Sequence, residues 1–81
     1  MIDLATIRFT PELLRCVPQA TARMYRVLPI GSAPDCIRIA LADPSDLQVL
    51  DELYLVLGRA IEPYVADKHQ LDAFIEKMYP N

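Results

Sequence analysis

Residues 36–65 decide the fold, and they read CIRIALADPSDLQVLDELYLVLGRAIEPYV. In the first part of this stretch Ile37, Ile39 and Leu41 alternate with smaller or charged side chains. A period of two is typical of a strand that packs one face against a core. We therefore predict a strand over residues 36–42.

A helix is predicted directly after this strand. Asp43 suits the cap position, Pro44 suits the first position of the helix, and Asp46 reinforces its positive end. All but one of the apolar residues of this helix occupy an arc of about half its circumference. The exception is Leu55, which lies on the polar half. The residues of the arc are Leu47, Val49, Leu50, Leu53, Tyr54, Val56 and Leu57.

The last part of the chain predicts a third strand and a final helix. Gly58 suits a C-terminal cap that ends the preceding helix. Residues 60–66 have the pattern of a strand, and Pro63 favours an edge position because proline cannot donate to a ladder. Asp67 is predicted to cap the final helix, which has one apolar stripe at spacings of three and four. The stripe consists of Leu71, Phe74, Ile75, Met78 and Tyr79, and we expect it to be core.

The first third of the chain predicts a Pro-kinked helical lead-in over residues 10–24, followed by a strand. Thr10 can cap the first turn, and Pro18 interrupts the helix because it lacks an N–H donor. Residues 25–30 have a β-like pattern in which Pro29 again favours an edge. We expect this strand and the next to form an antiparallel hairpin.

Together these elements predict one domain, residues 1–81, in the order α-β-β-α-β-α. The lead-in precedes a body, residues 25–79, that contains a strand–helix–strand unit. Such a unit gives parallel neighbours with a right-handed crossover. Because the other two strands carry prolines, residues 36–42 are expected at the centre. We predict an α/β (α+β) fold: a small three-stranded sheet covered by helices.

Composition and charge exclude several classes of function. Apolar residues make up 53% of the chain, which is enough for a core. The net charge of −3 argues against nucleic-acid binding, which needs clustered basic residues. The charge is uneven, because residues 1–40 carry five arginines and three acids, whereas residues 41–81 carry three basic and eight acidic residues. A basic front and an acidic back could steer a protein partner.

The sequence also predicts where the chain resides. No apolar run approaches the roughly 20 residues that span a bilayer, and no secretory signal is visible. Two cysteines, Cys16 and Cys36, are expected to be reduced, since nothing indicates an oxidising compartment. We therefore expect a cytoplasmic chain with no direct membrane insertion.

Catalytic, cofactor and metal sites are not predicted. The one histidine, His69, falls on the polar face of the final helix. Asp43, Asp46 and Asp51 lack the glycine-centred turn and closing glutamate of a calcium-binding EF-hand loop. The phosphate-binding pattern GxxxxGK[ST] does not occur. We predict that the chain is not an enzyme and holds no cofactor or metal.

Three segments carry a resemblance to a known family. They are VPQATARMYRVLPI (residues 17–30), IALADPSD (residues 39–46) and LGRAIEPYVA (residues 57–66). In order, they are similar to the patterns I-P-x-x-x-A…Y-x-V-L-P, V-A-M-A-D-P-x-D and G-x-x-V-x-P-x-V-A. The chain thus resembles, over nearly its whole length, the N-terminal domain of bacterial type II secretion and type IV pilus assembly ATPases.

The resemblance implies a docking or regulatory module ahead of a hexameric ATPase. Its partner would be the cytoplasmic part of an inner-membrane platform protein, or the parent ATPase itself. The chain would then lie at the inner face of the inner membrane through that partner. The Walker motor is missing, so the chain is not expected to hydrolyse ATP. Two alternatives stay open: a domain that senses cyclic di-GMP, and a free-standing adaptor of the same fold.

Some relatives bind cyclic di-GMP through a signature carried mainly by a helical segment upstream. That signature has an Arg-Leu-Gly start, spaced leucines and a closing glutamine. Here Arg8 is followed by Phe9 and Thr10, and no tandem leucine-rich motif occurs. We therefore expect no cyclic di-GMP binding by this chain alone.

Candidate partner contacts are one cluster of arginines and one leucine. The arginines lie within the first third of the chain, and the planar guanidinium group can bind carboxylates at an interface in bidentate fashion. The alternative is that these side chains lie along short helices with no partner. The candidates are Arg8, Arg15, Arg23, Arg26 and Leu55.

Overall fold

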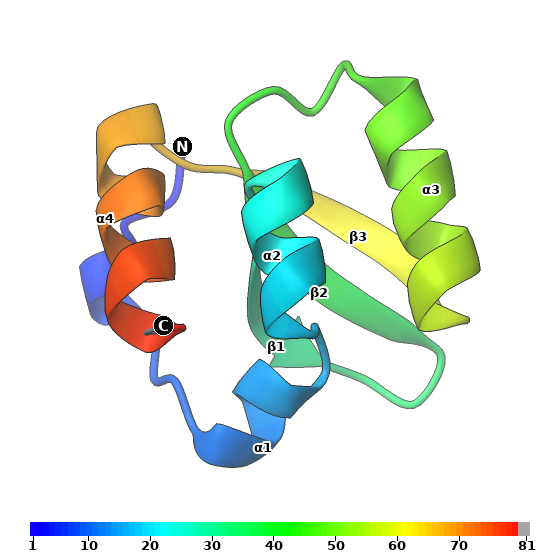
Figure 1. The fold of residues 1–81 in the computed structure, drawn as a ribbon, viewed down its shortest axis with the longest axis horizontal. Helices are drawn as coiled ribbons and strands as arrows, with labels where there is room; N and C mark the ends of the chain where they lie inside the picture. Colours follow the sequence, from blue (N-terminus) through cyan, green and yellow to red (C-terminus); the bar gives the residue numbers. More distant parts are fainter. Residues whose placement is uncertain (80–81) are drawn as a thin grey trace.

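The computed structural model describes residues 1–79. Three short helices precede a hairpin, and a strand–helix–strand unit and a final helix follow (Figure 1). The predicted order and α+β class are confirmed, with one additional 3₁₀ turn at the start. The elements are η1 (Leu4–Thr6), α1 (Pro11–Arg15), α2 (Gln19–Tyr25), β1 (Leu28–Ser32), β2 (Cys36–Leu41), α3 (Leu47–Leu57), β3 (Ala60–Val65) and α4 (Lys68–Met78).

Within the described residues, the strands form one sheet in the order β1-β2-β3. β1 and β2 are antiparallel, with Leu28 opposite Ala40. β2 and β3 are parallel, with Ile37 opposite Ile61. The prediction that the two proline-bearing strands lie at the edges is therefore confirmed, and β2 is the centre of the sheet.

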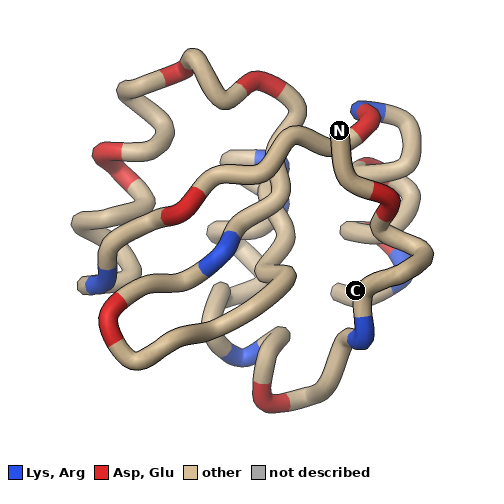
Figure 2. The backbone as a smooth tube through the Cα atoms, turned by 180° about the vertical axis from the view of Figure 1, so that it is seen from behind, with Lys and Arg blue, Asp and Glu red and all other residues tan. Residues whose placement is uncertain are grey.

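Helices gather on one side of this sheet. α2 and α3 lie in front of the strands in Figure 1, and the view from behind in Figure 2 shows the strands with no helix over them. The covered face carries Ile37, Ile39 and Leu41 of β2, all of them buried. Arg38 is exposed on the opposite face. The period-two pattern therefore identified Ile37, Ile39 and Leu41 as core residues, and Ala40, on the same face as Arg38, is buried as well.

The core joins the sheet to all of the longer helices. α4 contributes Leu71 and Ile75, both of which are buried as its apolar stripe predicts. Tyr79 is also buried, and Phe74 and Met78 of the same stripe are partly buried against the core. The buried apolar residues are Leu4, Val17, Ala22, Val27, Leu28, Ile37, Ile39, Ala40, Leu41, Leu53, Ala66, Leu71, Ile75 and Tyr79.

Several predicted caps are confirmed. The Thr10 hydroxyl accepts from the Leu13 N–H at 3.1 Å, and the Asp67 carboxylate accepts from the Gln70 N–H at 2.9 Å. Gly58 ends α3 in the left-handed conformation, with φ of 69°, which a glycine adopts without a Cβ penalty.

The predicted cap of α3 is wrong by three residues. Asp46, not Asp43, accepts from the Val49 N–H at 3.3 Å, so α3 begins at Leu47. The Asp43 carboxylate instead accepts from the Ser45 N–H at 3.0 Å and from the Ser45 hydroxyl at 2.5 Å. A side chain that bonds its own turn in this way is not available to a helix. The segment after β2 is therefore a turn before it is a helix.

The first strand begins later than predicted. α2 extends to Tyr25 and ends at Arg26, which has a φ of 54° in the left-handed region. The Ala22 carbonyl then accepts from two N–H groups, those of Arg26 and, at 3.1 Å, Val27. β1 consequently spans Leu28–Ser32 rather than residues 25–30.

No helix within residues 1–79 is long and apolar enough to cross a membrane. Cys16 and Cys36 are both free thiols in the structure.

Candidate functional site

In the described part of the chain the acids, thiols and histidine do not form a metal site. Within residues 1–79 no three His, Cys, Asp or Glu side chains come together in a group that could hold a metal ion. His69 is exposed on α4.

Two of the four predicted arginines bind α4 of their own chain. Arg23 Nη1 lies 2.8 Å from Glu76 Oε1, and the same guanidinium donates to the Tyr79 carbonyl. Arg26 lies 3.5 Å from Asp72 and 3.6 Å from Glu76. These contacts join the C-terminal end of α2 to α4 across more than 45 residues of sequence. Arg23 and Arg26 thus hold two helices together, and a partner contact by either stays a prediction.

Arg8 and Arg15 are placed differently. Arg8 lies between η1 and α1, and Arg15 is the last residue of α1. Both are exposed, and neither makes an ion pair or hydrogen bond to another residue within 1–79. Their predicted contact with a partner remains a prediction, and their guanidinium groups are available for it.

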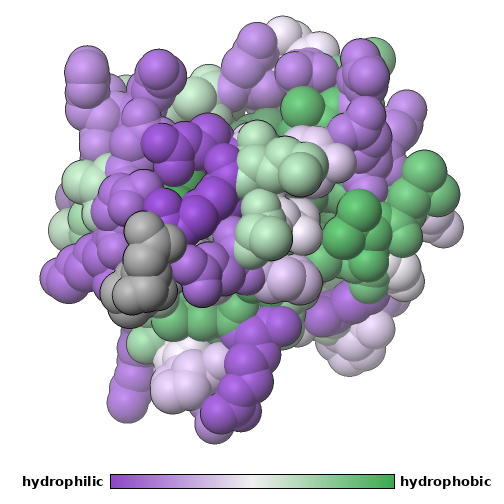
Figure 3. All heavy atoms as spheres, in the orientation of Figure 1, coloured by the Kyte–Doolittle hydropathy of each residue, from purple (hydrophilic) through white to green (hydrophobic). Residues whose placement is uncertain are grey.

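α3 exposes much of the apolar arc that the sequence predicts. Leu53 is fully buried, whereas Leu47 is 69% exposed, Tyr54 55% and Val56 52%. Leu55, the apolar residue on the polar half of the helix, is 77% exposed. Figure 3 shows hydrophobic side chains gathered on the side of the molecule where α3 lies. A helix that buries only part of its apolar surface is a candidate contact surface.

Helical spacing places four of these α3 residues on one face. Leu47, Asp51 and Leu55 follow one another at steps of four, and Tyr54 lies seven residues after Leu47. All four are exposed. We call these four residues the α3 outer face. From the sequence, only Leu55 of these four is a candidate contact. The exposure of the other three depends on how α3 packs against β3, which the sequence does not give.

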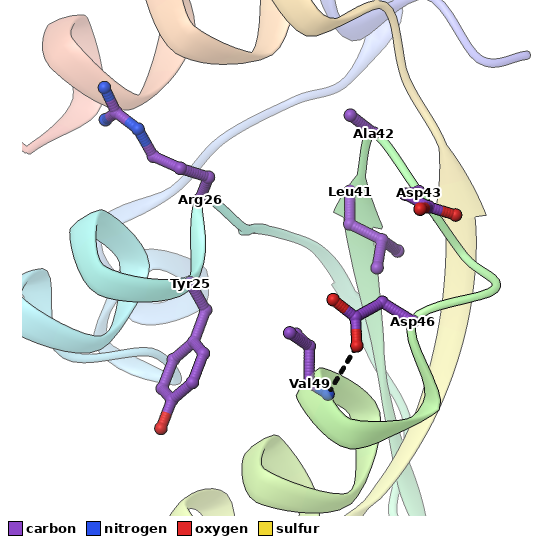
Figure 4. Close-up of a pocket in the computed structure, with 7 residues that line it drawn as sticks. All are labelled: Tyr25, Arg26, Leu41, Ala42, Asp43, Asp46 and Val49. Atoms are coloured by element: carbon purple, nitrogen blue, oxygen red, sulfur yellow. Dashed lines mark hydrogen bonds between the residues drawn. The ribbon is translucent and has the colours of Figure 1, made fainter.

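A small pocket lies between the end of α2 and the start of α3 (Figure 4). Its volume is about 160 Å³. Asp43 and Asp46 line it, but both carboxylates already accept hydrogen bonds from their own turn. The bonds from Ser45 lower the pKa of Asp43. The full lining is Tyr25, Arg26, Leu41, Ala42, Asp43, Asp46 and Val49.

A polar cluster occupies the uncovered face of the sheet. Arg38 on β2 lies opposite Glu62 on β3, with 3.4 Å between Nε and Oε1. The Tyr64 hydroxyl donates to the same carboxylate, and this bond, with a smaller effect of Arg38, lowers the pKa of Glu62. The same contact raises the pKa of Tyr64. These side chains pair with one another across β2 and β3. Only the strand register, which sequence reasoning did not give, brings them together.

Comparison with known proteins identifies the family. The whole chain, residues 1–81, matches the MshEN domain family. The chain belongs to this family. An MshEN domain of this kind occurs in the N-terminal part of secretion and pilus ATPases and is not itself their catalytic domain.

One curated relative of this chain is the type IV pilus assembly ATPase PilB of Myxococcus xanthus (strain DK1622). The two are 30% identical over 78 residues, which is 96% of this chain and 14% of PilB. The chain therefore spans about one seventh of the length of that relative.

Solved structures share the fold. The MshEN domain superposes on MshE with cdg, that is cyclic di-GMP, with a TM-score of 0.84 and 32% identity over 96% of this chain and 57% of the other. It superposes on the N-terminal domain of XpsE with TM-scores of 0.74 and 0.77 in two crystal forms. The two XpsE matches have 18% and 19% identity. They cover 94% and 95% of this chain and 54% and 55% of the XpsE chain. At this level of identity they show the fold alone. The resemblance drawn from the three sequence segments is confirmed.

Proposed function

We propose that the chain is a docking module that joins a secretion or pilus assembly ATPase to the cytoplasmic part of an inner-membrane platform protein. The observation that carries the proposal is the exposed apolar surface of α3 on a domain whose relatives are parts of ATPases. An exposed apolar surface on a small domain is typical of a protein contact.

Charge supports the same proposal. Arg8 and Arg15 present guanidinium groups that no other residue within 1–79 engages. Arginine is enriched at protein interfaces because its planar fork binds carboxylates in two parallel hydrogen bonds. The proposed module thus has an apolar contact on α3 and a separate basic contact near α1. Residues 1–81 would form this single domain at the inner face of the inner membrane.

Calorimetry between the chain and the purified cytoplasmic part of the platform protein tests the proposal. We expect binding, and we expect Arg15→Glu to weaken it by about threefold to tenfold, as for a charge at the edge of an interface. Lys68→Glu is the matched control, because it makes the same change in net charge at an exposed residue of α4. Absence of binding by the unchanged chain would overturn the proposed function.

A second candidate function is recognition of cyclic di-GMP. It is favoured by the 32% identity to MshE, whose structure contains that ligand. Against it, Arg8 is followed by Phe9 rather than by the Leu-Gly of the binding signature. Moreover, the match covers 57% of the MshE chain, so MshE includes a large part that this chain does not match.

Titration of the chain with cyclic di-GMP separates the two functions. Our proposal predicts no heat of binding beyond dilution. A saturable heat with one ligand or one ligand pair per chain would favour the second function.

A further inference from the structure

The α3 outer face has a chemistry that selects its occupant. Every charged side chain between residues 43 and 57 is acidic. Asp51 lies on the same helical row as Leu47 and Leu55, between them. It is exposed, and it makes no hydrogen bond or ion pair to another residue within the part of the chain that the structure describes. The face is thus an apolar stripe with one unengaged negative charge at its middle.

This combination argues against three classes of occupant. An anionic membrane surface attracts helices whose polar face is rich in Lys and Arg, and α3 has neither. Nucleic acid is excluded for the same reason, since its phosphates need basic groups. A second copy of the chain, packed α3 against α3 about a two-fold axis, would bring the two Asp51 carboxylates together. Like charges in direct opposition destabilise such a contact.

We propose that the α3 outer face binds an amphipathic helix of the platform partner that carries a Lys or Arg within its apolar face. The apolar residues of that helix would contact Leu47, Tyr54 and Leu55, and its cation would pair with Asp51. This inference rests on the proposed docking function and specifies the surface and the chemistry of the contact. The ion pair with Asp51 would fix where the partner helix lies along α3.

The geometry of α3 fits a helix better than an extended segment. Leu47, Asp51 and Leu55 form a ridge along the row of every fourth residue. Ridges of this kind pack into the grooves between the corresponding rows of a second helix. α3 spans 11 residues, which is three turns, and it offers anchors at both ends of the ridge.

Two variants of the chain and two matched controls test this contact, with the purified cytoplasmic part of the platform protein as the probe. Leu55→Asp places a charge at one of the two apolar anchors of the contact, and we expect affinity to fall by about tenfold or more. Its control is Met24→Asp on α2, because Met24 is 72% exposed and Leu55 is 77% exposed. Asp51→Lys should weaken binding by about threefold and reduce its dependence on salt. Its control is Asp35→Lys in the hairpin loop, which should change neither.

The outcomes separate this inference from the function on which it rests. Circular dichroism and thermal unfolding first establish that all four variants keep the fold. Binding that Leu55→Asp and Asp51→Lys leave unchanged would overturn the α3 contact and leave docking intact. Equal losses with Leu55→Asp and Met24→Asp would also overturn it. No binding by the unchanged chain would overturn both the contact and the docking function.

Discussion

Truncating Leu53 to alanine should destabilise the domain strongly, whereas the same change at Leu55 should not. Leu53 is fully buried beneath α3 and Leu55 is 77% exposed, although the two lie on one helix only two residues apart. Removing a buried leucine side chain costs about 2.7–5 kcal/mol, because apolar contacts are lost and a cavity remains. A surface substitution changes stability by about 0.5 kcal/mol at most.

This difference is large compared with the stability of so small a domain. Total stability is expected at about 4–12 kcal/mol for a chain of this length. Leu53→Ala should therefore lower the melting temperature by more than about 10 °C, since each 1 kcal/mol corresponds to about 4–8 °C. Leu55→Ala should leave it within about 4 °C of the unchanged chain.

Urea unfolding followed by circular dichroism at 222 nm measures both variants against the unchanged chain. Repeating the measurement at two protein concentrations establishes whether self-association contributes. If Leu55→Ala costs as much as Leu53→Ala, then the outer face of α3 is packed and is not a free surface. That result would refute the placement of α3 and, with it, the proposed docking surface.

Three further changes test the local structure. Burial raises the pKa of Tyr79 to about 12. An unfolded tyrosine titrates near 10, so the contribution of Tyr79 to stability should be fully present below about pH 10 and should fall by up to about 2 kcal/mol towards pH 12. Tyr79→Phe should abolish this loss in a pH series of urea titrations, at a cost of about 1 kcal/mol for the lost bond of 3.0 Å to the Leu14 carbonyl. Asp46→Ala should lower the free energy of unfolding by about 1 kcal/mol because it removes the cap of α3, whereas Asp46→Asn should preserve the cap. Equal urea midpoints for the two variants would contradict this role of Asp46. Gly58→Ala should lower the free energy of unfolding by about 1 kcal/mol in the same assay, because φ is 69° at this residue. No atom crowds the site, so the backbone conformation alone accounts for the loss. An unchanged urea midpoint would argue against the left-handed end of α3.

Local sequence signals account for most of the fold. Alternation identified the covered face of β2, and Pro29 and Pro63 identified the edge strands, because each signal depends on a residue and its immediate neighbours. Thr10 and Asp67 were identified as caps for the same reason. A local rule succeeds where no distant residue competes for the same group.

The remaining features depend on competition between neighbours or on distant contacts. Asp43 and Asp46 are both acceptable caps, and the choice depends on Ser45, whose hydroxyl engages Asp43. Arg23 and Arg26 are candidate partner contacts from the sequence, and their pairing with α4, more than 45 residues away, could not be predicted from it. Such contacts require the fold to be known first.

A contact between residues far apart in sequence also holds the hairpin loop between β1 and β2. Arg59, which no sequence pattern marked, donates to the Ser32 hydroxyl at 2.7 Å and to the Cys36 carbonyl at 2.9 Å. It also donates to the Ala33 carbonyl. This arginine connects the end of α3 to the β1–β2 turn, and its role follows from the order of the strands.

A nuclear magnetic resonance titration tests whether α3 is the docking surface. The ¹⁵N-labelled chain is titrated with the unlabelled cytoplasmic part of the platform protein, and the backbone amide signals are followed. Our account predicts that signals of α3 between residues 47 and 56 shift or broaden most, with a second, smaller set near Arg8 and Arg15. Signals that do not change, or changes confined to the uncovered face of the sheet around Arg38, would contradict it.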